Sequence, residues 1–213
     1  MFIHRTPFFL PWLYSNLVWR IRTERKELFL TLDDGPVPGP TEFALDVLRK
    51  YRARATFFCI GDNVQKHPDV FKRILQEGHA VGNHTFNHLN GWETPKAEYV
   101  ENTTLCDAVM DEHQTGNKTK KVVLFRPPYG RITRAQIKAL SAYNIIMWDV
   151  LSFDYTESIS AEACLKNSIK ATRPGSVIVF HDSLKAEKNM RYALPRFIEH
   201  FTEKGYSFNI IPQ

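Results

Sequence analysis

Residues 28–36 read Leu-Phe-Leu-Thr-Leu-Asp-Asp-Gly-Pro, and this stretch decides the fold. Its first five residues are apolar except for Thr31, as in a strand of a parallel sheet that helices cover on both faces. Asp33 and Asp34 then stand at the carboxyl end of the strand, before a Gly-Pro turn. Residues 55–60, Ala-Thr-Phe-Phe-Cys-Ile, form a second run of the same kind. The two runs predict a parallel α/β sheet with acidic side chains at one edge.

Outward from this strand, apolar runs alternate with amphipathic segments to the end of the chain. The expected strands are 28–32, 55–60, 79–83, 122–125, 145–148, 177–180 and 207–211. The expected helices are 41–51, 68–77, 94–113, 133–142, 160–171 and 191–204, the last bent near Pro195. This order predicts an incomplete (β/α) barrel of about seven strands, with an open doubly wound sheet as the alternative. In both folds, sites form at the carboxyl ends of the strands.

The composition indicates one globular domain. The chain has 213 residues, of which 43% are hydrophobic and 24% charged, and it contains neither an internal repeat nor a Ser/Gly linker. The 28 Lys and Arg residues exceed the 23 Asp and Glu residues, for a net charge of +5. Because no RNA-binding or zinc-knuckle motif accompanies these charges, we expect no nucleic-acid partner. Cys59, Cys106 and Cys164 are too widely spaced to indicate a disulfide framework or a thiolate metal site.

The first 26 residues differ from the rest of the chain. They contain apolar clusters, but Pro7 and Pro11 interrupt them and no signal-peptide cleavage pattern follows. We expect residues 1–26 to form a non-helical clasp packed on a domain of residues 27–213. No stretch reaches the roughly 18 apolar residues of a membrane span. The expectations that follow are a cytoplasmic protein and no membrane partner.

Acidic and imidazole side chains follow the first and third expected strands. Asp33 and Asp34 would repel each other unless a cation or an arginine lies near them, although Asp-Gly-Pro also suits a plain turn. His84 and His88 are four residues apart, so both rings can face one ion on a helical turn, although a solvated pair has the same spacing. Two histidines and one carboxylate leave an open coordination position for water.

Three later strand ends add further polar groups. Residues 126–130 read Arg-Pro-Pro-Tyr-Gly, and the two prolines stiffen a loop in which the amides of Tyr129 and Gly130 are free to form an oxyanion hole. Asp154 follows the fifth strand. His181 ends the sixth strand and is either a core residue or a proton donor that faces the pocket.

These residues carry a resemblance that extends from about Leu28 to the C-terminus. The matching segments, in order, are TLDDGP at 31–36, HTFNH at 84–88, RPPYG at 126–130, SFDY at 152–155 and VIVFH at 177–181. They resemble the five motifs of the NodB-homology polysaccharide deacetylases, carbohydrate esterase family 4. The resemblance implies a deformed (β/α) barrel and a metal-dependent amidohydrolase that removes acetyl groups from N-acetylated sugars.

The resemblance also implies roles for five residues. Asp33 would be the general base and His181 the general acid. Asp34, His84 and His88 would bind a divalent ion, for which we expect Zn²⁺, with Co²⁺, Mn²⁺ or Ni²⁺ as alternatives.

Three neighbouring residues would support this chemistry. Arg126 would keep Asp33 ionised and oriented, and Asp154 would pair with Arg126 or His181. The backbone amide of Tyr129 would stabilise the oxyanion.

Aromatic and aliphatic side chains near these loops are candidates for binding the sugar. Tyr129 and Tyr155 can stack on it, although the family usually has a tryptophan where Tyr155 stands. Trp92 either lines the groove or caps the barrel, and Trp148 is expected in the core. Val177 and Val179 are expected either to receive the acetyl methyl group or to belong to the core.

No export signal or membrane span is seen, and Tyr155 offers less stacking surface than the tryptophan that is usual in the family. The expected substrate is therefore a small, soluble N-acetylated sugar: N-acetylglucosamine or a short chitooligosaccharide. The sequence leaves three alternatives open. The first is a deacetylase of peptidoglycan or of another glycan or glycolipid. The second is a non-haem iron oxygenase, which also uses two histidines and a carboxylate, and the third is a catalytically silent sugar-binding protein. The oligomeric state is not predicted.

Overall fold

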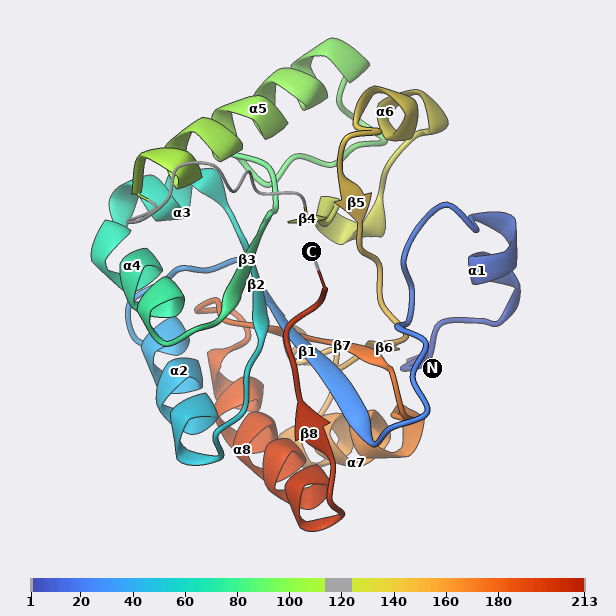
Figure 1. Ribbon diagram of the computed structural model, residues 1–213, viewed down its shortest axis with the longest axis vertical. Coiled ribbons are helices and arrows are strands. Elements are labelled where there is room, and N and C mark those ends of the chain that lie inside the picture. Colours follow the sequence, from blue (N-terminus) through green and yellow to red (C-terminus); the bar gives the residue numbers. More distant parts are fainter. Residues whose placement is uncertain (1, 114–123, 213) are drawn as a thin grey trace.

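The computed structural model describes residues 2–113 and 124–212, and Figure 1 shows a central sheet enclosed by helices. The strands are β1 (Glu27–Asp33), β2 (Thr56–Cys59), β3 (Ala80–Asn83), β4 (Leu124–Phe125), β5 (Asn144–Ile145), β6 (Val150–Leu151), β7 (Val177–His181) and β8 (Ser207–Phe208). The helices are α1 (Phe9–Leu13), α2 (Pro40–Lys50), α3 (Gly61–Lys66), α4 (Pro68–Gln76), α5 (Lys96–His113), α6 (Arg134–Ala139), α7 (Ala161–Ala171) and α8 (Glu187–Glu203), with a 3₁₀ turn, η1, at Pro128–Gly130.

The sheet curls into a barrel that does not close. Its strands follow the order β5-β4-β3-β2-β1-β7-β6, and β8 pairs with β1 outside this path. Every pairing between these strands is parallel. Since β5 and β6 are consecutive in the chain but lie at opposite ends of the path, a seam separates them. The prediction of an incomplete (β/α) barrel is confirmed, and the doubly wound alternative is excluded.

The two faces of β1 enter two different apolar clusters, because alternate side chains of a strand point to opposite faces. Leu28, Leu30 and Leu32 belong to the large cluster that packs against the helices. Phe29 belongs to a second cluster that contains residues of β2, β4 and β7. The register places Asp33 beside His181, so packing along β1 also fixes the relative position of these two polar side chains.

The N-terminal segment occupies the seam between β5 and β6. Arg5 forms an antiparallel bridge with Val150, and Val18 forms a parallel bridge with Ile146. The backbone N–H of Thr6 donates to the carbonyl oxygen of Asp149 at 2.9 Å. Backbone groups at both edges of the open barrel are therefore paired by the first 20 residues.

Several sequence-based element assignments need correction. The prediction that residues 1–26 are non-helical is wrong, because Phe9–Leu13 is the helix α1; Pro11 lies within its first turn, where a missing N–H costs little. The helix α3 was not anticipated. The expected strand at 145–148 is shorter, and β6 is a separate strand. Residues 122 and 123 of the expected strand 122–125 lie outside the described residues.

The last helix is longer than expected. The helix expected at 191–204 begins at Glu187 and continues through Pro195. Its buried neighbours Leu194 and Phe197 pack in the main core, which offsets the hydrogen bond that the proline lacks. The three cysteines are buried free thiols. Across the described part of the chain, the helices are too short or too polar to cross a bilayer.

A glycine pair tests how firmly the N-terminal segment is held in the seam. Gly175 has φ 80°, and a Cβ added there would lie 2.0 Å from the carbonyl oxygen of Ile21. Gly205 has φ 77° but open space around it. We expect Gly205→Ala to lower the free energy of unfolding by about 1 kcal/mol through backbone strain alone. Gly175→Ala should cost about 2 kcal/mol more, because it also displaces the segment.

Chemical denaturation of both variants beside the unsubstituted protein measures this difference. Equal losses of stability would show that the contact between Gly175 and the N-terminal segment carries little energy.

Candidate active site

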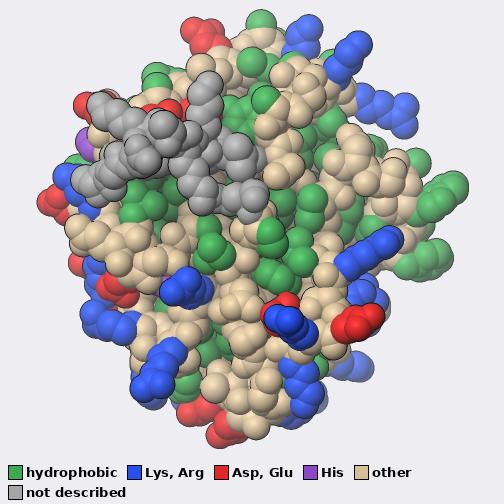
Figure 2. Space-filling model, in the orientation of Figure 1, with side chains coloured by type: hydrophobic (Ala, Val, Ile, Leu, Met, Phe, Trp, Pro, Cys, Tyr) green, Lys and Arg blue, Asp and Glu red, His purple; other side chains and the backbone are tan. Residues whose placement is uncertain are grey.

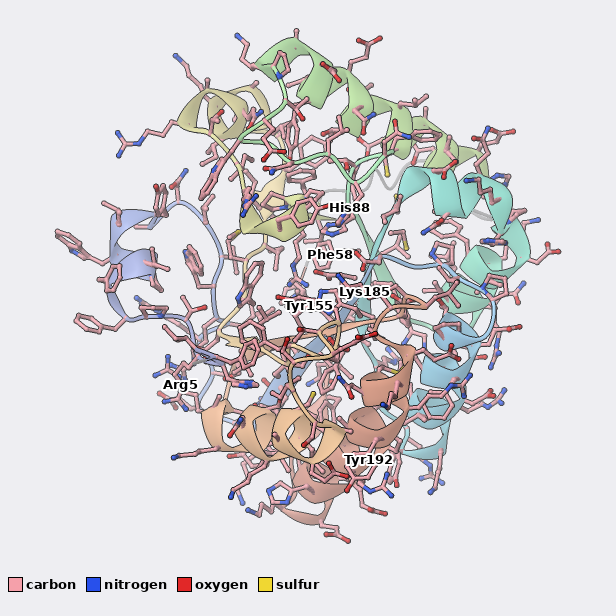
Figure 3. The ribbon with its side chains drawn as sticks, turned by 180° about the vertical axis from the view of Figure 1, so that it is seen from behind. Arg5, Phe58, His88, Tyr155, Lys185 and Tyr192 are labelled. Atoms are coloured by element: carbon pink, nitrogen blue, oxygen red, sulfur yellow. The ribbon has the colours of Figure 1, made fainter. Side chains whose placement is uncertain are left out.

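The carboxyl ends of the strands surround one cavity of about 420 Å³. Figure 3 looks onto this end of the barrel, where His88, Tyr155 and Lys185 converge from different loops. The lining residues are Asp33, Asp34, His84, His88, Pro127, Tyr129, Arg131, Trp148, Leu151, Tyr155, Val179, His181 and Lys185. All five sequence motifs therefore meet at the wall through polar or aromatic side chains, and β7 adds Val179 beside His181.

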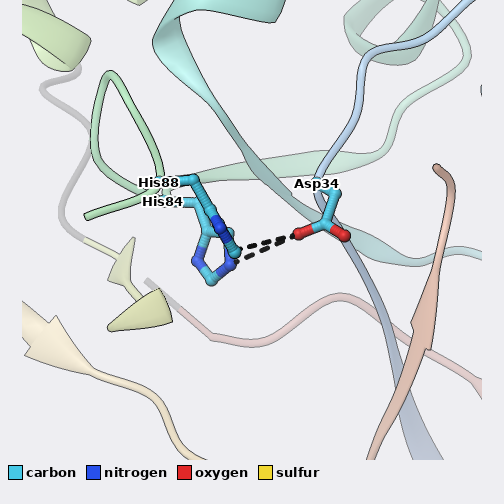
Figure 4. A group of neighbouring side chains, drawn as sticks. All are labelled: Asp34, His84 and His88. Atoms are coloured by element: carbon cyan, nitrogen blue, oxygen red, sulfur yellow. Dashed lines mark ion pairs between the residues drawn. The ribbon is translucent and has the colours of Figure 1, made fainter. Parts of the chain in front are cut away.

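Three side chains could hold a metal ion. One ligand atom each from Asp34, His84 and His88 lies within 4.8 Å of the other two (Figure 4). Asp34 Oδ1 is 3.3 Å from Nε2 of His88 and 3.8 Å from Nε2 of His84. Asp34 has φ 87°, an uncommon conformation, and the Asn63 side chain on α3 holds it by donating to its carbonyl oxygen at 2.7 Å.

The surroundings of the two imidazoles suit metal binding. Nδ1 of His84 lies 2.8 Å from the carbonyl oxygen of Arg126, which can only accept, so Nδ1 carries the proton and Nε2 presents a lone pair. Burial lowers the pKa of His84 to about 4, so the ring is neutral at pH 7. The ring of His88 is oriented by Tyr129, whose hydroxyl can donate or accept and lies 3.1 Å from Nδ1.

The carboxylate completes a suitable donor set. Burial alone would raise the pKa of Asp34, but the hydrogen bond with His88 and the charges of nearby histidines hold it below the usual range. One carboxylate oxygen and two imidazole nitrogens are donors that Zn²⁺ and similar divalent ions accept. The residues present therefore fit such an ion.

Asp33 lies beside this group and is bound to a buried arginine. Its side chain is 5% exposed, and its Oδ1 accepts a hydrogen bond from the fully buried Arg126 guanidinium at 2.6 Å. The same nitrogen of Arg126 donates to the hydroxyl of Thr31 at 2.6 Å. The guanidinium compensates the charge of Asp33 and fixes its orientation, which leaves the second carboxylate oxygen available to accept a proton.

His181 faces the same cavity and is paired with a different acid. Its Nδ1 lies 2.7 Å from Asp154 Oδ1, and its backbone N–H donates to Asp154 Oδ2 at 2.8 Å. Burial alone would lower the pKa of His181, but the carboxylate of Asp154 outweighs it and raises the pKa to about 9. The ring is therefore protonated at neutral pH and can donate a proton from Nε2. Of the two partners expected for Asp154, the structure selects His181.

The loop at η1 supplies one free amide rather than two. The N–H of Gly130 donates to the carbonyl oxygen of Pro127 at 3.0 Å, which corrects the expectation that this amide is available. None of the described residues accepts from the N–H of Tyr129. Tyr129 has φ 60°, and its side chain packs over the His88 ring at 4.6 Å. This backbone N–H is thus the remaining candidate for an oxyanion donor in the loop.

A family model described as polysaccharide deacetylase matches residues 20–148, which is more than half of the chain. The chain belongs to the polysaccharide deacetylase family. It is an N-deacetylase with a NodB-homology fold, so the family, the fold and the deacetylase activity expected from the five motifs are confirmed.

Characterised relatives agree with this assignment. The deacetylase is 33% identical over 196 residues to a peptidoglycan-N-acetylglucosamine deacetylase of Bacillus cereus, covering 90% of this chain and 89% of the relative. It is 32% identical over 165 residues to a chitooligosaccharide deacetylase of Azorhizobium caulinodans, covering 76% and 77%. Among solved structures, the Bc1960 peptidoglycan N-acetylglucosamine deacetylase in complex with an N-hydroxybenzamide superimposes with a TM-score of 0.87 at 30% identity, covering 97% and 95%. These matches show an enzyme that deacetylates N-acetylated glycans.

Some of the candidate sugar-binding residues line the cavity of the deacetylase, and others do not. Tyr129, Tyr155 and Val179 line it. Val177 is fully buried in the core. Trp92 is 65% exposed and lies outside the cavity wall.

Four residues of the wall were missed or only partly placed by sequence reasoning, and Leu151 on β6 is one of them. Trp148 packs against a core cluster as expected but also lines the cavity, because β5 ends three residues before it. Arg131 and Lys185 also line the cavity. Their positions offered a signal, since Arg131 directly follows the RPPYG motif and Lys185 lies four residues after His181.

A buried acid behind the site was also missed. Asp182 accepts a hydrogen bond from the N–H of Gly35 at 3.0 Å and another from the hydroxyl of Thr41 at 2.6 Å. A Cβ on Gly35 would lie 2.0 Å from this carboxylate. Asp182 therefore positions the turn that carries Asp34, and only glycine fits beside it.

The adjacent aspartates allow a matched test of their roles. Asp33→Asn should reduce turnover about 10²-fold or more while metal content stays near that of the unsubstituted enzyme, because the base is lost and the ligands remain. Asp34→Asn should lose bound metal as well as activity, because a neutral amide is a poor substitute for the carboxylate. Metal analysis after desalting and initial rates are measured on both variants. The reverse pattern of metal loss would exchange the two roles.

The pairing of Asp154 with His181 predicts the alkaline limb of the pH profile. We expect catalysis to use the proton on His181, so activity should fall as the pH rises through the pKa near 9. Asp154→Asn removes the negative charge that raises this pKa and should move the limb to lower pH. Ser152→Ala is the control, because it removes a 2.8 Å hydrogen bond to Asp154 but leaves the charge. An unmoved limb in Asp154→Asn would show that another group sets it.

Proposed function

We propose that this enzyme hydrolyses the acetamide of N-acetylglucosamine units in a divalent-metal-dependent reaction that releases acetate and a free amine. The observation that carries the proposal is that a group suited to accept a proton and a group suited to donate one line the same cavity. Asp33 is a carboxylate fixed by Arg126 and ready to accept a proton, and His181 is an imidazolium ready to give one. The candidate metal ligands lie at the same cavity.

The residues divide the reaction between them. A divalent ion at Asp34, His84 and His88 would activate water and polarise the acetamide carbonyl. Asp33 takes the proton of the attacking water. The N–H of Tyr129 donates to the carbonyl oxygen as negative charge develops there, an effect worth about 3 kcal/mol for one donor.

His181 then completes the cleavage. As the C–N bond breaks, it donates its proton to the departing nitrogen, and Asp154 keeps the ring oriented throughout. The acetyl methyl group can lie against Val179 and Leu151, both of which line the cavity. Tyr155 packs edge-on to the His181 ring at 4.8 Å and offers a face on which a sugar can stack.

The size of the cavity and the charges on its wall favour different substrates, so there are two candidate substrates. A neutral chitooligosaccharide matches the small-substrate expectation and the cavity of about 420 Å³. Peptidoglycan, which carries carboxylates, is favoured by Arg131 and Lys185, two cations on the cavity wall. Lys185 lies 5.8 Å from the Tyr155 ring centre, so a sugar stacked on that ring would have an ammonium group nearby. The B. cereus relative supports this second candidate.

Acetate release over a substrate panel tests the proposal. The panel is N-acetylglucosamine, chitooligosaccharides of two to six units, and solubilised peptidoglycan. We expect acetate and free amine in equal amounts, loss of both on chelation, and recovery with Zn²⁺ or Co²⁺. Higher kcat/KM on peptidoglycan at low salt would identify the anionic substrate, and higher kcat/KM on the oligosaccharides the neutral one.

Two results would contradict the assignment. Full activity in a metal-free sample would remove the metal requirement. Turnover that depends on O₂ and Fe²⁺ would favour the oxygenase alternative.

A further inference from the structure

Most exposed large hydrophobic side chains of the described residues lie in one short segment. Ten such side chains are exposed, and six of them belong to the first 13 residues: Phe2, Ile3, Phe8, Phe9, Trp12 and Leu13. Phe8 is 90% exposed and Trp12 82% exposed. We call the segment Phe2–Leu13 the apolar lobe. This exposure is costly in water, so the lobe calls for a partner.

The lobe projects from the body of the protein. Figure 1 shows α1 standing at the side of the barrel, away from the other helices, and no residue of α1 is buried. Figure 2 shows hydrophobic side chains protruding at the same edge, with Lys and Arg side chains above and below them. The side of the lobe that faces away from the barrel is thus convex.

Positive charge is concentrated in the N-terminal part of the chain that contains the lobe. Residues 1–26 contain five Lys and Arg residues and one Glu, a net charge of +4 out of the +5 of the whole chain. All five cations are exposed: Arg5, Arg20, Arg22, Arg25 and Lys26. Two further cations, Arg134 and Lys138 of α6, lie beside the end of the lobe, because they line a surface hollow together with Leu13 and Tyr14.

We propose that the apolar lobe docks on the surface of an anionic phospholipid bilayer. Aromatic side chains are stable at the boundary between lipid headgroups and acyl chains, and flanking cations bind the negatively charged headgroups. A bilayer yields to a convex surface, so side chains as exposed as Phe8 and Trp12 can be inserted without a matching pocket. The protein would lie on the membrane through this lobe and would not span it, which departs from the expectation of no membrane partner.

A second copy of the chain matches the lobe less well. Four surface hollows outside the active site are described, and in each the Arg and Lys residues outnumber the Glu residues. The lining charges are Arg20, Arg22 and Arg25 with Glu24 and Glu27; Arg134 and Lys138; Arg52 and Arg54; and Arg49, Arg52 and Arg54 with Glu77. A basic lobe would be repelled from basic hollows. Charge complementarity therefore favours an acidic surface, as an anionic bilayer provides.

Vesicle sedimentation tests the proposal with the unsubstituted full chain. The vesicles contain phosphatidylcholine and phosphatidylglycerol at a ratio of about 7:3, with pure phosphatidylcholine as the comparison. We expect binding to the anionic vesicles that weakens about tenfold or more between low and high salt, because the headgroup interaction is screened.

The double substitution Phe8→Ser/Trp12→Ser should reduce vesicle binding about tenfold or more, because it removes both of the most exposed rings. Leu105→Ser is the matched control, since Leu105 on α5 is also exposed, at 46%, but lies far from the lobe in sequence and belongs to another surface. It should bind like the unsubstituted protein. Both variants should retain acetate release from a soluble oligosaccharide, so a failure of docking is distinguishable from a failure of the deacetylase assignment.

Tryptophan fluorescence shows which part of the protein enters the lipid. Anionic vesicles should shift the emission to shorter wavelength. Trp12→Phe should keep binding but lose the shift, whereas Trp92→Phe should keep both, because Trp92 is 65% exposed outside the lobe.

Three outcomes would overturn the proposal. They are no binding to anionic vesicles at low salt, unchanged binding by Phe8→Ser/Trp12→Ser, and a shift that survives Trp12→Phe. A dimer in solution that this double substitution abolishes, together with no vesicle binding, would assign the lobe to a second copy instead.

Discussion

The buried guanidinium of Arg126 is the interaction on which the site depends. It donates to Asp33 and Thr31 on β1, and to the carbonyl oxygens of Ile146 and Met147, which follow β5. The ring of Phe58 lies 4.1 Å from its central carbon. One side chain thereby joins β1, in the middle of the sheet, to the residues after β5, at the edge of the open barrel. Removing one partner of such a buried pair costs about 3–5 kcal/mol, because the other charge is left without compensation.

The backbone of the same residue also prepares the metal ligands. Its carbonyl oxygen fixes the tautomer of His84, while its side chain fixes Asp33. The result is an asymmetric pair of carboxylates. Asp33 faces a permanent cation and keeps one oxygen available to accept a proton, whereas Asp154 faces His181 and keeps a proton on that ring. Since the register places Asp33 beside His181, acid and base remain close without either neutralising the other.

The sequence predicted the barrel and the metal group because both depend on local signals. Apolar runs that end in acids or histidines mark the strands of a parallel sheet and their carboxyl edge, as β1 and Asp33 show. The position of Trp148 depended instead on where β5 ends, and a two-residue strand leaves no periodicity to read. The hydrogen bond that occupies the Gly130 amide and the acid behind Gly35 depend on turn geometry that spacing does not encode.

In the N-terminal segment, composition alone did not predict which apolar side chains are exposed. Its main chain fills the seam through Arg5 and Val18, which requires only backbone groups. The side chains of Leu17 and Trp19 enter a core cluster, whereas those of Phe8 and Trp12 point outward almost completely. An apolar segment that packs by its backbone and one that packs by its side chains have the same composition, so the pattern predicted a clasp and missed the exposed surface. Sealing an open barrel with backbone hydrogen bonds is therefore what allows this segment to keep its aromatic rings for another contact.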